Sequence, residues 1–270
     1  MAWIVAAELH RGRFIEARRS ARELMELGRQ RSDPRATGFG LMWLGLVAIV
    51  SESYAEALEY SEQASAVAVA PIERNGALAF KGIALVLMRQ LEEGLLLLKQ
   101  QSDRLNADGV LSISNLTDPV IGVAKVLNGN LTEGINWIEQ AILRREQEGA
   151  RHFADWYRLI LGEIYLQGLI GKEKPPLWIV LKNLPMLLAI RLTASPRIQK
   201  LMRHVLENPL FDPDGFRVGH AHVILGLLYK VKNKRPIALK HLTEAKRILA
   251  QFGPSQKLTR VETALAELGQ

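Results

Sequence analysis

The 270-residue chain contains no cysteine. This absence excludes a disulfide framework, thiolate catalysis and any metal site built on thiolates, and it fits a reducing compartment. Aromatic residues are scarce at 6%, whereas apolar residues make up 48% of the chain, enough for an extended core. The first residues also lack the basic segment that opens a secretory signal peptide. We therefore expect a cytoplasmic protein.

The sequence also lacks an apolar run long enough to span a bilayer. The longest apolar stretch, from Leu177 to Leu192, is interrupted by Lys182, Pro185 and Arg191. A spanning helix needs about 20 predominantly apolar residues. The chain is thus expected to have no transmembrane segment.

Catalytic and ligand-binding motifs are missing too. The chain has no phosphate-binding Gly-x-x-x-x-Gly-Lys-Ser/Thr loop and no Gly-x-Ser-x-Gly nucleophile turn. Gly38, Gly40 and Gly45 do not match a dinucleotide fingerprint and instead suit close helix packing. His220 and His222 are two positions apart, so on a helix they point about 200° apart and cannot share one ion. The sequence predicts no enzyme, no cofactor and no metal.

Positive charge is concentrated in the last third of the chain. Residues 1–171 carry 18 Lys and Arg against 21 Asp and Glu, and residues 172–270 carry 17 against 7. One interpretation is a solvated helical face that meets an acidic partner domain. The alternative is binding to nucleic acid or to an anionic surface, although no aromatic residues are interleaved for base stacking. The candidate basic patch consists of Lys230, Lys232, Lys234, Arg235, Lys240, Lys246 and Arg247.

A glycine in a helical context recurs along the chain. Gly45, Gly82, Gly122, Gly162 and Gly226 are separated by 37, 40, 40 and 64 positions. The last spacing equals one repeat of 40 plus 24 residues, which predicts one insertion. Such a period is typical of stacked helical repeats.

Each copy combines an apolar helix carrying Leu-Gly or a near equivalent, a short turn, and a second helix with small residues three to four positions apart. Two antiparallel helices approach closely where the facing residue is small, and one pair cannot bury its apolar faces alone. The sequence therefore predicts one all-α domain: a right-handed superhelix, or solenoid, of about six helix pairs with a capping helix. The copies are placed at about 1–32, 36–70, 73–106, 114–149, 152–208 and 216–252, and the cap at 255–270.

The insertion in the fifth copy, residues 171–196, lies where prolines gather. Six of the eleven prolines fall within 39 residues, and proline interrupts helices. We expect Leu177–Leu192 to form one or two short helices laid over the fold, and Arg197–Glu207 to supply the second helix of copy five. The prolines are Pro175, Pro176, Pro185, Pro196, Pro209 and Pro213.

The copies resemble tetratricopeptide repeats, most directly in copies two, five and six. The order of features along the chain further resembles the C-terminal helical-repeat region of bacterial multidomain class III adenylate/guanylate cyclases. In that family a cyclase domain and an AAA-type ATPase domain precede the repeats. The resemblance implies a signal-transduction context and a regulatory scaffold without cyclase chemistry of its own. It rests on Ala55–Leu58 with Tyr60, Glu92–Leu98, Gly134–Arg145, Glu163–Gln167, Lys182–Pro185 and Leu225–Lys230.

In tetratricopeptide superhelices the first helix of each pair lines a groove, and here that face is expected to be apolar. An apolar groove of this size is expected to be covered by the insertion, a partner helix or a second subunit. The partner would be an upstream domain of the same parent protein, which would cover the uncapped first helix, or a separate regulator. A small-molecule sensor with Trp156 and Trp178 as walls is a further alternative. The groove residues are Phe39, Met42, Leu46, Ile49, Ala79, Ile83, Val86, Leu116, Val123, Val126, Trp156, Leu159, Glu163, Leu166, Val223, Leu227 and Lys230, with His220 beside them.

Overall fold

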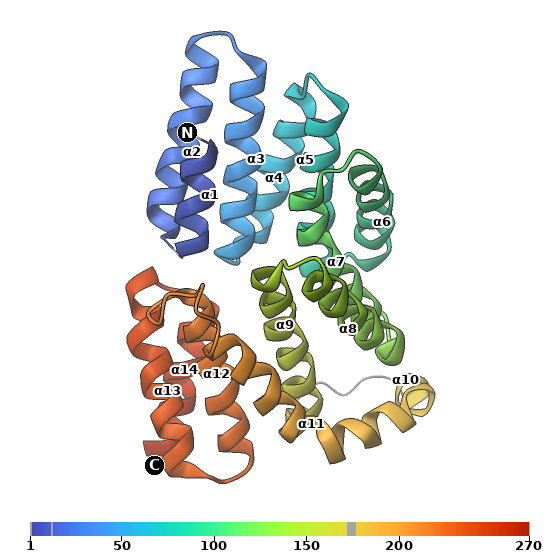
Figure 1. The fold of residues 1–270 in the computed structure, drawn as a ribbon, viewed down its shortest axis with the longest axis vertical. Helices are drawn as coiled ribbons and strands as arrows, with labels where there is room; N and C mark the ends of the chain where they lie inside the picture. The colour runs from blue at the N-terminus through green and yellow to red at the C-terminus, as the bar shows by residue number, and fades with distance from the viewer. Residues whose placement is uncertain (1, 12, 172–176, 270) are drawn as a thin grey trace. The chain divides into compact units, whose positions relative to one another are not determined.

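The computed structural model describes residues 2–11, 13–171 and 177–269. Within these ranges the chain forms 14 α-helices and no strand (Figure 1), which confirms the all-α prediction. Successive helices pack in adjacent pairs, as a helical repeat requires. None of the described helices combines the length and the apolar character that crossing a bilayer would demand.

The helices are joined mostly by short connections. A short connection of two or three residues separates most neighbours, and η1 (Ala250–Phe252) precedes the last helix. The helices are α1 (Ala2–Arg11), α2 (Phe14–Gln30), α3 (Pro34–Val50), α4 (Tyr54–Val67), α5 (Pro71–Leu87), α6 (Leu91–Ala107), α7 (Leu111–Leu127), α8 (Leu131–Gln147), α9 (Arg151–Ile170), α10 (Leu177–Lys182), α11 (Leu184–Leu206), α12 (Phe216–Val231), α13 (Arg235–Leu249) and α14 (Gln256–Gly269).

The chain packs as two compact units. Unit 1 spans Met1–Asn128 and contains α1–α7, in which each helix from α2 onward packs on the next. Unit 2 spans Gly129–Gln270 and contains α8–α14. There α9 packs on α8, α11 and α12, while α12 and α13 form the most extensive pair.

The recurring glycines mark equivalent helix crossings. A Cβ atom placed on Gly45, Gly82 or Gly226 would lie 2.6–3.2 Å from an atom of the residue sixteen positions later, in the second helix of the same pair. The close approach thus depends on the missing side chain. The three facing residues are Ser61, Leu98 and Leu242.

Gly162 makes the same kind of approach, with a longer connection. A Cβ atom there would lie 2.7 Å from Cε of Met202, forty positions later. Forty is the usual sixteen plus the 24 extra residues that the spacing of the glycines predicts. Gly122 is buried in α7. The extra segment therefore lengthens the fifth pair without moving its crossing point.

Six of the connections repeat one turn. The residue after the helix C-cap has a positive φ of 52–71°, and the next amide donates to the carbonyl five positions earlier at 2.8–2.9 Å. This is the Schellman pattern, which satisfies carbonyls at the helix end. Its left-handed residue is Ser32, Glu52, Arg89, Gly109, Gly149 or Asn233.

The insertion differs from expectation in where its helix ends. We predicted a break between Leu192 and Arg197, but α11 runs without interruption from Leu184 to Leu206 and includes Pro196. Pro185 lies in the first turn of α11, where its missing amide has no helical partner. Because Pro196 has no amide hydrogen, the carbonyl of Leu192 loses its helical hydrogen bond. The Leu192 side chain is 82% exposed, so water can reach this turn and take the place of the missing donor. Pro175 and Pro176 lie outside the described residues.

Candidate functional site

The predicted basic patch lies on α12, α13 and the turn between them. Lys232 donates to the Ser195 hydroxyl at 2.8 Å, whereas Lys234, Arg235 and Lys240 are exposed and have no ion-pair partner among the described residues. The other three members are held by acidic side chains, which removes much of the charge that nucleic acid would need. Lys230 pairs with Glu267, Lys246 with Glu262, and Arg247 with both Asp214 and Glu244.

The seventeen predicted groove residues are divided between core and surface. Eight are buried and hold helices together: Met42, Ala79, Ile83, Val86, Leu159, Leu166, Val223 and Leu227. Nine keep some exposure: Phe39, Leu46, Ile49, Leu116, Val123, Val126, Trp156, Glu163 and Lys230. In unit 2 the accessible members are Trp156, Glu163 and Lys230. The accessible members in unit 1 are all apolar, whereas those in unit 2 include the charged residues Glu163 and Lys230.

A polar cluster joins α9, α12 and α14 in unit 2. Glu163 of α9 accepts a hydrogen bond from Gln167 at 2.7 Å and pairs with Arg260 of α14 at 2.9 Å. Its second oxygen lies 3.8 Å from Nε2 of His220 on α12, and neither of these two buried atoms has a hydrogen-bond partner among the described residues. The cluster brings together two of the positions that the sequence placed on one face, Glu163 and His220.

The charge states of this cluster limit its chemistry. Although burial opposes it, the contacts with His220 and Arg260 lower the pKa of Glu163 to about 2. Burial lowers the pKa of His220, against the opposing effect of Glu163. A carboxylate with so low a pKa is a poor proton acceptor near neutral pH.

A second buried cluster fixes the start of α9. Asp155, fully buried, pairs with Arg158 and accepts a hydrogen bond from Asn208. Arg158 also pairs with Glu146 of α8. Burial lowers the pKa of the nearby Arg217 to about 10, an effect that Asp155 opposes. Because each charged group lies near a group of opposite charge, we interpret the cluster as structural: it holds α8, α9 and the loop after α11 together.

A third group ties α11 to α8 and α9. Arg197 of α11 donates to the Tyr165 hydroxyl at 2.7 Å and lies 3.6 Å from Glu139 of α8. Tyr165 in turn donates to Glu139 at 3.0 Å. Burial, with Glu139 nearby, raises the pKa of Tyr165 to about 12, so the phenol stays protonated.

Sequence reasoning missed a histidine pair between α12 and α13. Nδ1 of His222 lies 2.9 Å from Nδ1 of His241, and the ring of Tyr229 stacks on His241. One ring must donate and the other accept, so at least one of the two is neutral. The signal was available in the repeat: the two histidines are nineteen positions apart on facing helices. Across the described ranges, no three His, Asp or Glu side chains are grouped to hold a metal.

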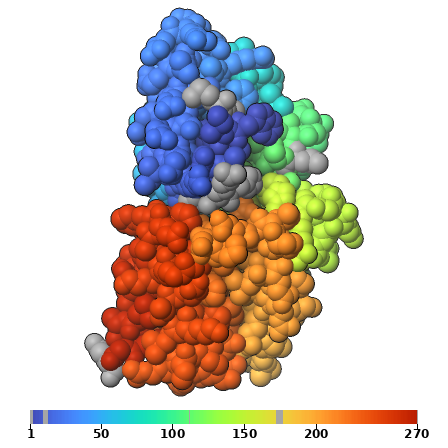
Figure 2. Space-filling view, turned by 60° about the vertical axis from the view of Figure 1, so that its left-hand side comes forward, coloured from blue at the N-terminus to red at the C-terminus, as the bar shows by residue number. Residues whose placement is uncertain are grey.

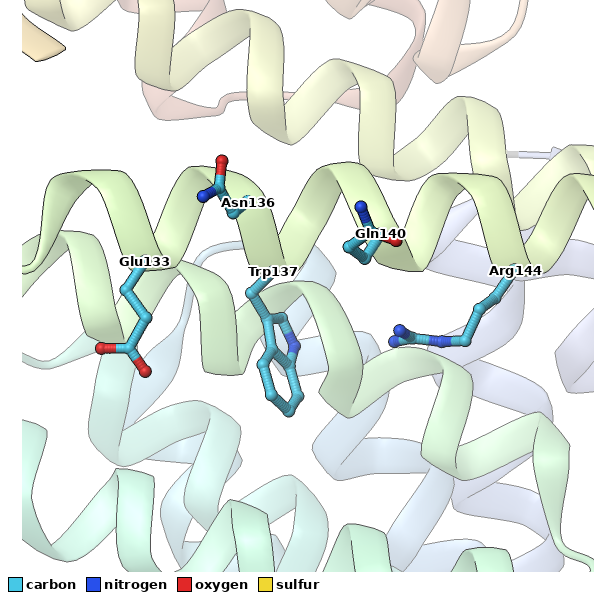
Figure 3. Close-up of a pocket in the computed structure, with 5 residues that line it drawn as sticks. All are labelled: Glu133, Asn136, Trp137, Gln140 and Arg144. Carbon is cyan, nitrogen blue, oxygen red and sulfur yellow. The ribbon is translucent and has the colours of Figure 1, made fainter.

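A shallow pocket of about 320 Å³ lies along α8. Figure 3 shows Glu133, Trp137 and Arg144 extending from the same side of this helix. All five described lining residues, Asn136 and Gln140 included, come from α8. A ligand site normally gathers polar groups from several elements, so we do not assign this pocket as one.

No protein-family model and no curated protein matches this chain. The tryptophans proposed as walls of a small-molecule pocket do not favour that role, because Trp178 is 59% exposed on α10.

The most prominent accessible features are apolar. On the first helix pair of unit 1, Trp3 is 87% exposed, Ile4 52% and Ile15 73%. We call these three residues the first-pair face. Val5, on the other side of α1, is fully buried, so the pair is folded around a core and still presents an apolar exterior. Figure 2 shows α1, in the darkest blue, on the visible surface of unit 1.

Proposed function

We propose that the chain is a non-catalytic helical-repeat scaffold of the tetratricopeptide type, which binds another protein through the first-pair face. The observation that carries this proposal is the exposure of Trp3 together with Ile4 and Ile15. Trp3 and Ile4 lie near the start of α1 and Ile15 near the start of α2, and large apolar side chains gathered on one exposed helix pair are candidates for an interaction site. Tryptophan in particular is a frequent anchor of protein interfaces.

The surroundings of this face also suit a protein partner. Glu8 of α1 and Arg13, just before α2, lie 3.7 Å apart. Arg13 is the exposed member of this ion pair, at 55% against 18% for Glu8, so the apolar residues are accompanied by a charge that is already paired, as polar groups border many protein interfaces. A nucleic acid or an anionic membrane would favour a rim of one positive sign. The occupant in this proposal is a separate protein or another domain of a longer parent.

A binding experiment with matched variants tests the proposal. The full chain, the double variant Trp3→Asp/Ile15→Asp and the control Leu96→Asp would each be cross-linked in cell extract, and the captured protein would then be purified and titrated. Leu96 is 61% exposed on α6, so its replacement adds the same charge elsewhere on unit 1. We expect the face variant to bind at least about tenfold more weakly, and the control to bind like the wild type.

The same preparations test the absence of catalysis. We expect no conversion of ATP or GTP to a cyclic nucleotide above the blank. Turnover by the purified chain, or a captured protein that binds the face variant as well as the wild type, contradicts the proposal.

The signalling context is a further part of the proposal and rests on the sequence resemblance alone. We propose that the scaffold belongs to a cyclase-type signalling protein and that its partner is an upstream domain of that protein. The complete reading frame is the direct test. A frame without a cyclase-type domain upstream contradicts this part and leaves the scaffold proposal intact.

A further inference from the structure

The insertion carries a second exposed apolar surface, in unit 2. Its six large side chains are 43–82% exposed although they lie on ordered helices. We call them the insertion stripe: Leu177, Trp178 and Leu181 on α10, and Leu184, Leu188 and Leu192 on α11.

The helix α11 has two apolar faces. Ile190, Ala194 and Ile198 are buried, and α11 packs on α9. The three leucines of the stripe follow each other at intervals of four, which places them together on a different face. A helix that only needed to pack on α9 would carry polar residues there. The second face therefore requires an apolar environment of its own.

A buried asparagine holds the stripe in a fixed orientation. The Asn183 side chain, between α10 and α11, donates to the carbonyls of Gly129 and Ile179, each at 2.8 Å, and accepts from the Leu131 amide at 3.0 Å. Ile179 also packs against Gly129, where a Cβ atom would approach it to 3.2 Å. Figure 1 shows α10 and the first half of α11 at the margin of unit 2. The apolar side chains are thus presented outward by an anchored element.

The charges on these two helices all have one sign. No aspartate or glutamate occurs from residue 177 through residue 206. The basic side chains in this range are exposed: Lys182, Arg191, Arg197, Lys200 and Arg203. Arg197 is engaged with Tyr165 and Glu139, whereas the charge of the others is not cancelled by any acid of their own helices. The surface is complementary to an apolar region bordered by negative charge.

We propose that the insertion stripe lies on the surface of an anionic lipid bilayer. The leucines and Trp178 enter the boundary between headgroups and acyl chains, and Lys182 and Arg191 contact lipid phosphates. A bilayer supplies both requirements at once, an apolar layer under a continuous anionic plane, and tryptophan favours this boundary. The long stems of lysine and arginine let their charges reach the headgroups from beside an apolar stripe. This goes beyond the scaffold function and does not depend on the first-pair face.

Vesicle flotation of the intact chain tests the proposal. Vesicles of phosphatidylcholine with about a third phosphatidylserine provide the anionic surface, and pure phosphatidylcholine vesicles the neutral one. We expect the wild type to float with the anionic vesicles, and the double variant Leu188→Asp/Leu192→Asp to bind at least about tenfold more weakly. A blue shift of fluorescence on binding should be smaller in the Trp178→Phe variant, which still binds.

Matched controls separate the stripe from general effects. Leu96→Asp and Trp3→Asp/Ile15→Asp should bind the anionic vesicles like the wild type, because neither alters the stripe. Unchanged thermal unfolding of the stripe variant shows that it is folded, as expected for exposed positions.

Three results overturn the proposal. One is a wild type that binds neither kind of vesicle, and another is binding that the stripe variant retains. The third is a dimer in sedimentation that the stripe variant dissociates while lipid binding is absent, since the stripe then covers a second copy of the chain. Loss of the protein partner in the first-pair variant, by contrast, bears only on the scaffold function.

Discussion

At the scale of single residues, the helix crossings depend on the absence of a side chain at particular positions. Gly38 and Gly40 are two residues apart on α3, yet they differ in what a methyl group would meet. A Cβ atom on Gly40 would lie 2.4 Å from the backbone nitrogen of Met25, whereas one on Gly38 would lie 3.5 Å from a Val67 methyl. The backbone of Met25 cannot move aside, whereas the end of the Val67 side chain can. Alanine at the two glycine positions should therefore change the stability in opposite directions.

We predict that Gly40→Ala destabilises unit 1 by about 2–4 kcal/mol, because α2 and α3 must separate. Gly38→Ala is expected to be neutral or to stabilise by up to about 1 kcal/mol, because alanine is the better helix former. Urea unfolding of the two variants beside the wild type measures both. Equal destabilisation by the two substitutions contradicts the described crossing.

The histidine pair predicts a dependence of stability on pH. Burial, with His222 and Lys240 nearby, lowers the pKa of His241 from 6.5 to about 4. The folded state therefore favours neutral His241, and the unfolded chain binds a proton first as the pH falls below 6.5. The stabilisation is fully present above pH 6.5 and is lost progressively as the pH falls toward 4.

We predict that His241→Gln reduces this loss of unfolding free energy by about 1 kcal/mol, after allowance for solvent screening at a partly exposed site. The unfolding free energies of both proteins would be compared from pH 7.5 down to pH 4. The value at pH 7.5 reports the packing change alone. Parallel profiles for the two proteins would show that His241 does not titrate in this way.

At the scale of elements, the repeated turn carries a conformational cost wherever its left-handed residue is not glycine. Ser32 has φ 52°, and Gly149 has φ 71° with no atom within 4 Å of a built Cβ. Side-chain space is therefore open at Gly149, and only the backbone conformation matters there.

We predict that Ser32→Gly stabilises and that Gly149→Ala destabilises, each by about 1 kcal/mol. Thermal unfolding of the single variants measures the two effects. Ser51→Gly is the control, because Ser51 has φ −85° and precedes the left-handed residue. A gain for Ser51→Gly as large as that for Ser32→Gly would contradict the role of the turn.

The sequence predicted some of the helices well and others poorly. The glycine spacing predicted the helix pairs and the length of the insertion, because close crossings admit few residue types. The end of the inserted helix was not predicted, since Pro196 costs little on an exposed turn of a helix that α9 holds in place. Glu163 and His220 were placed on a common face from spacing, whereas their contact with Arg260 depends on where α14 packs, which no local pattern determines.

At the scale of the whole molecule, most helices pack on their neighbours in the chain, whereas α11 packs chiefly on α9. Stability in such an array is close to a sum of local terms. A Cβ atom on Gly226 would lie 2.6 Å from Leu242, so Gly226→Ala should loosen the pair α12–α13.

We predict that Gly226→Ala lowers protection from hydrogen exchange at least about tenfold in α12 and α13 and leaves α3–α5 unchanged. Exchange read by mass spectrometry resolves these segments. A uniform loss of protection in both units would show instead that the chain opens as one cooperative body.

The helix crossing at Gly162 is kept although the connection between its two helices is longer, which bears on where this chain tolerates inserted segments. Because 24 additional residues fit between the helices of one pair without shifting their contact, the connection there is a site where chain length is free to vary. The equivalent connection in a neighbouring copy, such as Asn233 between α12 and α13, lies in the same kind of turn. It should accept a grafted module of similar size, which would let one framework carry several independent attachments.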